Sequence, residues 1–122
     1  MNRAEFKKYI KDTYSTLPEY PWESQSSYAV FRHKDNKKWF AVVMRISKRK
    51  LGIDSDENAD VVNLKCDPIV IGSLRNEQGF YPAYHMSKAH WITAVLDSNT
   101  DEEKLKWMLA LSFELTAKNK KR

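Results

Sequence analysis

The chain has 122 residues, of which 42% are hydrophobic and 30% charged, the composition of an ordinary soluble protein. A chain of this length forms one domain around one core. No apolar run approaches the roughly 18 residues that span a bilayer, and charged residues interrupt the first turns, so we expect a cytoplasmic protein without a secretory signal. Cys66 is the only cysteine, which excludes an intrachain disulfide and a cysteine-based zinc site.

The net charge of +5 is unevenly distributed along the chain. Residues 32–50 hold eight basic residues and one acidic residue, and residues 54–60 then hold four acidic residues. Residues 118–122 add four positive charges, as a basic tail after a domain that we expect to span residues 1–117. The basic stretch favours an anionic partner.

The first predicted element is a helix over residues 3–15, where apolar residues recur every three or four positions. Asn2 and Glu5 have the spacing of a capping box at its start. Two prolines end the helix, and we expect an ordered loop over residues 18–27 that aromatic side chains, Trp22 among them, hold in place.

Two stretches rich in aromatic and β-branched residues, 28–33 and 38–46, predict a β-hairpin. The strand alternation predicts a core-facing set made of Phe40, Val42, Met44 and Ile46. Trp39, Val43 and Arg45 then lie on the opposite face. Because the helices of such a domain gather on one side of its sheet, we expect this opposite face to be open to solvent.

The second half of the chain predicts five further elements. A long polar connection over residues 47–60 leads to a strand over 61–66, and Asp67-Pro68 starts a short helix. Two strands follow, over 81–86 and 91–96, and Thr100 with Glu103 forms a capping box for the last helix. The order α-β-β-β-α-β-β-α predicts a single α+β domain, an antiparallel sheet with helices packed on one face.

Patterns typical of metal binding or catalysis are incomplete. His85 and His90 point to opposite faces if the segment is extended. Residues 54–58 resemble the start of a calcium loop, but Ala59 stands where that loop needs glycine. Strand alternation turns Cys66 inward, away from any base that would activate it. We therefore expect a non-enzyme that binds no metal, cofactor or small-molecule ligand.

Two classes of partner fit the basic and aromatic residues of the predicted open face. Aromatic rings among lysines and arginines can stack bases and neutralise phosphates. The same apolar residues can form an interface with a second copy or another protein.

Four stretches stand out together: Pro21-Trp22, Lys38-Trp39-Phe40-Ala41, Asn63-Leu64-Lys65-Cys66-Asp67-Pro68, and Tyr84-His85-Met86 with Lys88, His90 and Trp91. In this combination the chain resembles the MmcQ/YjbR family of small bacterial proteins. The resemblance implies an α+β fold similar to frataxin and secretion chaperones, and a DNA-binding role through two loops called wings. Here the wings correspond to residues 34–38 and 47–50.

We expect DNA binding mainly through phosphate contacts. The alternative is a protein-interaction module that can form a dimer. The acidic residues 54–60 would repel phosphate, so only the first half of the second wing remains attractive. The motif around residues 84–91 is expected mainly to fix a tight turn, with Trp91 buried and Lys88 exposed. The predicted DNA contacts are Lys37, Lys38, Arg45, Lys48, Arg49, Lys50 and Lys88.

Overall fold

The computed structural model describes residues 1–21, 28–74 and 76–117. In these residues the chain forms one α+β domain with the predicted order of helices and strands. The predictions for residues 22–27, including Trp22, and for the tail over residues 118–122 lie outside the described residues.

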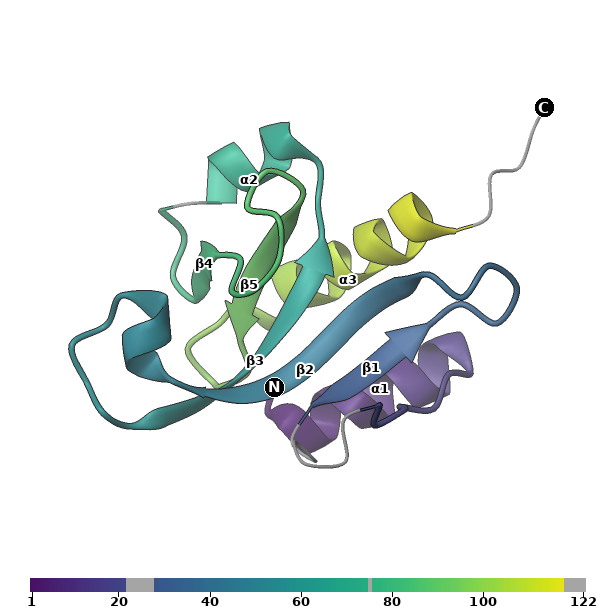
Figure 1. Cartoon of the computed structure of the whole chain (residues 1–122), viewed down its shortest axis with the longest axis horizontal. Coiled ribbons are helices and arrows are strands. Elements are labelled where there is room, and N and C mark those ends of the chain that lie inside the picture. The colour runs from purple at the N-terminus through teal and green to yellow at the C-terminus, as the bar shows by residue number, and fades with distance from the viewer. Residues whose placement is uncertain (22–27, 75, 118–122) are drawn as a thin grey trace.

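Figure 1 shows the elements in space. In chain order they are α1 (Arg3–Tyr14), β1 (Ala29–Arg32), β2 (Trp39–Ser47), the 3-10 helix η2 (Lys48–Leu51), β3 (Asn58–Lys65), α2 (Pro68–Leu74), β4 (Phe80–Pro82), β5 (Trp91–Val95) and α3 (Glu102–Thr116). Strand β3 begins three residues before its predicted start, whereas β4 ends at Pro82 and the rest of the predicted strand over 81–86 is irregular.

The sheet has the order β1-β2-β3-β5-β4, and all neighbouring strands are antiparallel. Helices α1 and α3 cover one of its faces (Figure 1), and the rings of Tyr14 and Phe113 join the two helices with centroids 4.5 Å apart. The main core lies between these helices and the sheet. Its fully buried helical residues include Phe6, Ile10, Leu105, Met108 and Leu109.

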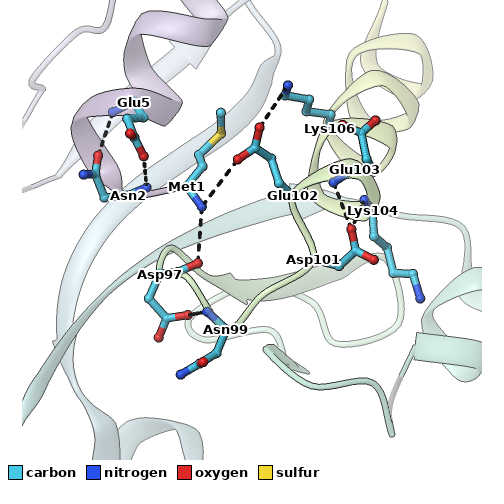
Figure 2. A network of polar contacts seen from close by, with 10 residues as sticks. All are labelled: Met1, Asn2, Glu5, Asp97, Asn99, Asp101, Glu102, Glu103, Lys104 and Lys106. Carbon is cyan, nitrogen blue, oxygen red and sulfur yellow. Dashed lines mark hydrogen bonds and ion pairs between the residues drawn. The ribbon is translucent and has the colours of Figure 1, made fainter.

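Figure 2 shows how the two long helices begin. The predicted capping box of α1 is confirmed, because Asn2 Oδ1 accepts from the Glu5 N–H and Glu5 Oε1 accepts from the Asn2 N–H, each at 2.8 Å. The prediction for α3 is wrong by one residue: Asp101 is the N-cap and accepts from two backbone N–H groups. Thr100 instead packs its hydroxyl against Gly79, where it has no hydrogen-bond partner among the described residues.

A β-bulge in β2 reverses the predicted faces of this strand. Ala41 is opposite Phe31 and Trp39 is opposite Arg32, which leaves Phe40 as the extra residue. Phe40 and the next residue therefore both face the helices. From there on, the alternation has the opposite phase to the one the sequence predicts.

The prediction of an open sheet face with Val43 on it is consequently wrong. Val43 is fully buried in the main core. The other face carries a second apolar cluster, and side chains from η2, from the connection that follows it and from residues 81–86 pack on it. Its buried strand residues are Val30, Val42, Met44, Ile46, Ala59, Val61 and Val95.

Candidate nucleic-acid interface

The basic residues of the second predicted wing are paired with the acidic residues that follow them. Lys48 Nζ lies 3.0 Å from Glu57 Oε1. Arg49 contacts both Asp56, at 2.5 Å, and Asp54, at 3.0 Å, and these two hydrogen bonds raise the pKa of its guanidinium. Lys50 is exposed and has no ion pair among the described residues. The loop is thus internally neutralised, and only one of its three cations is available to a phosphate.

Arg45 is also paired. Its guanidinium lies 3.4 Å from Asp60, which sits opposite it on β3, and Arg3 approaches the same carboxylate oxygen at the same distance. Because the bulge changes the phase of β2, Arg45 lies on the sheet face that the helices cover, whereas Trp39 lies on the opposite face.

The first predicted wing, at the tip of the β1–β2 hairpin, differs in its electrostatics. Lys34, Lys37 and Lys38 are exposed and have no ion pair among the described residues. Lys37 has a left-handed backbone with φ of 65°, which closes the tip. The two wings lie at opposite ends of β2, about 26 Å apart by the rise per residue of a strand.

Side-chain hydrogen bonds fix this hairpin tip to the end of α3. Asn36 Nδ2 donates to the Thr116 carbonyl at 2.8 Å, and Asn36 Oδ1 accepts from the Lys38 N–H at 2.8 Å. His33, which is buried, places Nε2 2.9 Å from Thr116 Oγ1 and 3.1 Å from the Phe113 carbonyl. The hairpin tip that holds the lysines is therefore fixed to the end of α3.

Sequence reasoning missed Lys65 as a candidate contact. It ends β3 at the same end of the sheet as the hairpin tip (Figure 1). Its ammonium lies 5.6 Å from the centre of the Trp91 ring and has no ion pair among the described residues. Four lysines, Lys34, Lys37, Lys38 and Lys65, are from here on called the hairpin-end lysines.

The segment between β4 and β5 folds as predicted in part. Lys88 is exposed, as expected, and its Nζ donates to the Ala83 carbonyl at 3.0 Å, while Trp91 is partly buried. His85 has a left-handed backbone with φ of 62°, and its ring lies 3.9 Å from the ring of Tyr84. The turn therefore directs His85 and Met86 onto the sheet face opposite the helices.

A groove of about 280 Å³ lies on this face of the sheet. Four segments far apart in the sequence line it, and three of them belong to the stretches that carry the family resemblance. The lining includes Tyr28, Trp39, Met44, Asn63, His85 and Met86. Only the folded chain brings them together, and burial, with the nearby Tyr84, raises the pKa of Tyr28, which keeps its hydroxyl protonated.

Asn63 is the buried polar residue of the groove. Its Nδ2 donates to the Tyr84 carbonyl at 2.8 Å, and its Oδ1 accepts from Thr93 Oγ1 at 2.5 Å. Thr93 Oγ1 accepts in turn from the Tyr84 N–H at 3.0 Å. This chain of bonds fixes which end of the amide is nitrogen and holds the 81–86 segment against the sheet.

Other chemistry has no visible support in the described residues. Burial, followed by the nearby Asp67 carboxylate, raises the pKa of Cys66 to about 11, so its thiol is protonated at neutral pH. No group of three or more potential metal ligands occurs within the described ranges. Among the helices of these ranges, none has the length and apolar character to cross a membrane.

These features define a class of small α+β protein in which a five-stranded sheet carries a basic hairpin at one end and a charge-balanced loop at the other. A family model described as YjbR matches residues 11–115. The chain is also 40% identical over 116 residues to the uncharacterized protein YyaQ of Bacillus subtilis, an alignment that covers 95% of this chain and 98% of the relative. The chain therefore belongs to the YjbR family.

Solved structures agree with this assignment. A crystal structure of a Pseudomonas syringae protein has 46% identity and a TM-score of 0.93, covering 96% of this chain and 100% of the other. A solution structure from the same species has 44% identity and a TM-score of 0.89, covering 100% and 98%. The Deinococcus radiodurans protein DR2400, with the family-model domain DUF419, shares the fold at 23% identity and a TM-score of 0.71, covering 97% and 80%.

Proposed function

We propose that this protein is a non-enzymatic DNA-binding protein whose main phosphate contacts are the hairpin-end lysines. The observation that carries the proposal is the difference between the two wings. Lys34, Lys37 and Lys38 have no carboxylate partner among the described residues, whereas Lys48 and Arg49 each have one or more.

A cation that is already paired with a carboxylate must leave this partner before it can bind a phosphate. A cation that neutralises a phosphate releases counterions from DNA, and this release drives binding. Lys48 and Arg49 would first have to leave their carboxylates, and the freed acids of residues 54–57 would then repel the same strand. The hairpin-end lysines have no ion pair to break among the described residues, and the hairpin tip holds one acidic residue, Asp35, against three in residues 54–57.

The basic residues 118–122 also favour the hairpin end of the molecule as the end that binds DNA. Residues 118–122 carry four positive charges and follow directly on Ala117. The last turn of α3 is hydrogen-bonded to the hairpin tip through Asn36 and His33. The tail is therefore attached to the chain beside the lysines that are proposed to bind phosphate.

Two triple variants with the same change in charge test the proposal. Replacing Lys34, Lys37 and Lys38 by alanine is expected to weaken DNA binding strongly and to flatten its salt dependence by about 0.9 per lost contact. Replacing Lys48, Arg49 and Lys50 by alanine also removes three positive charges and serves as the matched control. Fluorescence anisotropy with a labelled oligonucleotide at two salt concentrations measures both quantities.

The control is expected to lose much less affinity, because two of its three side chains are already neutralised. An equal or larger loss in the control would contradict the choice of wing. No binding by the wild-type protein at low salt would contradict DNA binding altogether.

The sequence predicted an open sheet face that includes Val43 as the surface of the protein-interaction alternative, and the structure does not have this surface. Val43 is buried, so Val43→Lys would disrupt the core instead of a dimer interface. A homodimer stays a prediction, without a surface assigned to it.

A further inference from the structure

The outer face of α3, which points away from the sheet, carries apolar side chains that no other described residues bury. Of the five large hydrophobic side chains that are exposed in the described residues, two lie on this face: Trp107 is 51% exposed and Leu115 is 48% exposed. Leu111, which is partly buried, lies between them. Because these residues follow one another at intervals of four, they form one continuous stripe about 12 Å long on the helix.

The charged residues beside this stripe are acidic. Glu103 precedes Trp107 by four residues and continues the stripe, and Glu114 follows Leu111 by three residues and lies beside it. Both carboxylates are exposed, and neither has an ion pair among the described residues. The outer face of α3 is therefore apolar and acidic, although the whole chain has a net charge of +5.

The two lysines of α3 flank this face and are paired with other acids. Lys104 Nζ lies 2.6 Å from Glu77 Oε1, and Lys106 Nζ lies 3.2 Å from Glu102 Oε2. Within the described part of α3, neither lysine therefore neutralises the carboxylates beside the stripe.

We propose that the outer face of α3 binds a helix of another protein, one that has an apolar stripe with lysine or arginine residues beside it. A ridge of side chains four residues apart packs into the groove between the ridges of a second helix. Tryptophan is enriched among the residues that contribute most to the affinity of protein interfaces. The cations of the partner would neutralise Glu103 and Glu114. This surface uses none of the hairpin-end lysines, so the inference does not depend on DNA binding.

The same two carboxylates disfavour other occupants of this face. DNA phosphates and the headgroups of an anionic membrane would meet Glu103 and Glu114 with like charge. In a symmetric pair of copies the same patch lies on both sides of the interface, so acidic residues would again meet acidic residues. A basic amphipathic helix matches both the apolar stripe and the charge.

The first arm of the test uses a labelled synthetic helix of about five turns, with leucines along one side and lysines beside them. A peptide of the same composition in scrambled order is the control. Fluorescence anisotropy is expected to show that the protein binds the amphipathic peptide about ten-fold more tightly than the scrambled one, because only the first presents an apolar stripe. Equal affinity for the two peptides, or no binding of either, would overturn the proposal.

The second arm compares two double variants of the protein. Trp107→Ala with Leu115→Ala removes the exposed side chains of the stripe and is expected to weaken binding of the amphipathic peptide by about ten-fold or more. Leu17→Ala with Ile69→Ala is the matched control, because these side chains are 65% and 83% exposed and lie outside α3. It is expected to change the affinity by less than about two-fold. Equal losses in the two variants would overturn the proposal.

Urea unfolding shows that both double variants are folded, which is expected because all four substituted side chains are exposed.

The third arm tests the charge of the partner. Glu103→Gln with Glu114→Gln is expected to weaken binding of the amphipathic peptide and to flatten its salt dependence, because two attractive charges are lost. Unchanged affinity and salt dependence would overturn the choice of a basic partner.

Light scattering of the protein alone tests the second copy as the occupant. A monomer is expected. A dimer that Trp107→Ala with Leu115→Ala converts to a monomer would assign this face to a second copy and overturn the proposal.

Discussion

At the scale of one residue, burial lowers the reactivity of the Cys66 thiol. Cys66 is 1% exposed, in the main core behind β3. The Asp67 carboxylate adds to the effect of burial, because it disfavours a second negative charge on the sulfur. We therefore assign Cys66 to packing of the main core.

This assignment makes a prediction about the pH dependence of stability. The pKa of Cys66 rises from its ordinary value of 9.0 to about 11 on folding, so between these values the unfolded chain releases the proton and the folded chain keeps it. Stability contributed by the thiol is therefore complete below pH 9 and falls by about 1.4 kcal/mol per pH unit between pH 9 and about 11.

Urea unfolding of the wild type and of Cys66→Ala, below and above pH 9, measures this effect. The stability advantage of the wild type is expected to shrink as the pH rises. An advantage independent of pH, or rapid reaction of the native thiol with a thiol reagent at neutral pH, would contradict the assignment.

At the scale of elements, Ser112 of α3 forms hydrogen bonds with backbone groups next to the bulge in β2. The β2–β3 ladder begins at Ala41 and Leu64, so Phe40 and Lys65 have no partner in this ladder. Ser112 Oγ donates to the Phe40 carbonyl at 2.6 Å and accepts from the Lys65 N–H at 2.9 Å. One buried hydroxyl thus satisfies two backbone groups and fixes α3 to the strands that carry Trp39 and Lys65.

Replacing Ser112 by alanine leaves both backbone groups unsatisfied in the core, so we expect a loss of about 2–3 kcal/mol in the free energy of unfolding. Ser73→Ala is the matched control, because Ser73 is also helical but exposed and donates only to the Val70 carbonyl. It is expected to change stability by less than about 0.5 kcal/mol. Similar losses in the two variants, measured by urea unfolding, would contradict this role of Ser112.

The order and type of the elements could be predicted from periodicity, capping residues and prolines, because these signals are local. The bulge at Phe40 could not, because an uninterrupted apolar run from Trp39 to Met44 reads the same with or without an extra residue. One undetected residue was enough to assign Val43 to the wrong face. The cap at Asp101 was missed for a similar reason, since Thr100 also satisfies the sequence pattern.

The candidate site depends more strongly on tertiary structure. The net charge of residues 32–50 is visible in the sequence, but the pairing of Arg49 with Asp54 and Asp56 requires the loop to fold back on itself. The groove requires four segments to meet on one face. Sequence reasoning therefore could not tell which of the basic residues form ion pairs and which do not.

At the scale of the whole molecule, the charges are separated along β2. The loop end holds Lys48 and Arg49 in ion pairs, whereas the hairpin end holds lysines that have no ion pair among the described residues, and the chain continues from this end into the basic residues 118–122. A DNA strand approaching this molecule is therefore expected to be drawn to the hairpin end.

The most direct measurement is a titration of the ¹⁵N-labelled protein with oligothymidylate, followed by amide and indole chemical shifts. If the hairpin-end lysines bind the strand, shifts concentrate at residues 34–38 and at Lys65. Residues 47–57 are expected to shift little. Shifts concentrated in residues 47–57, or an absence of shifts at low salt, would contradict DNA binding through the hairpin-end lysines.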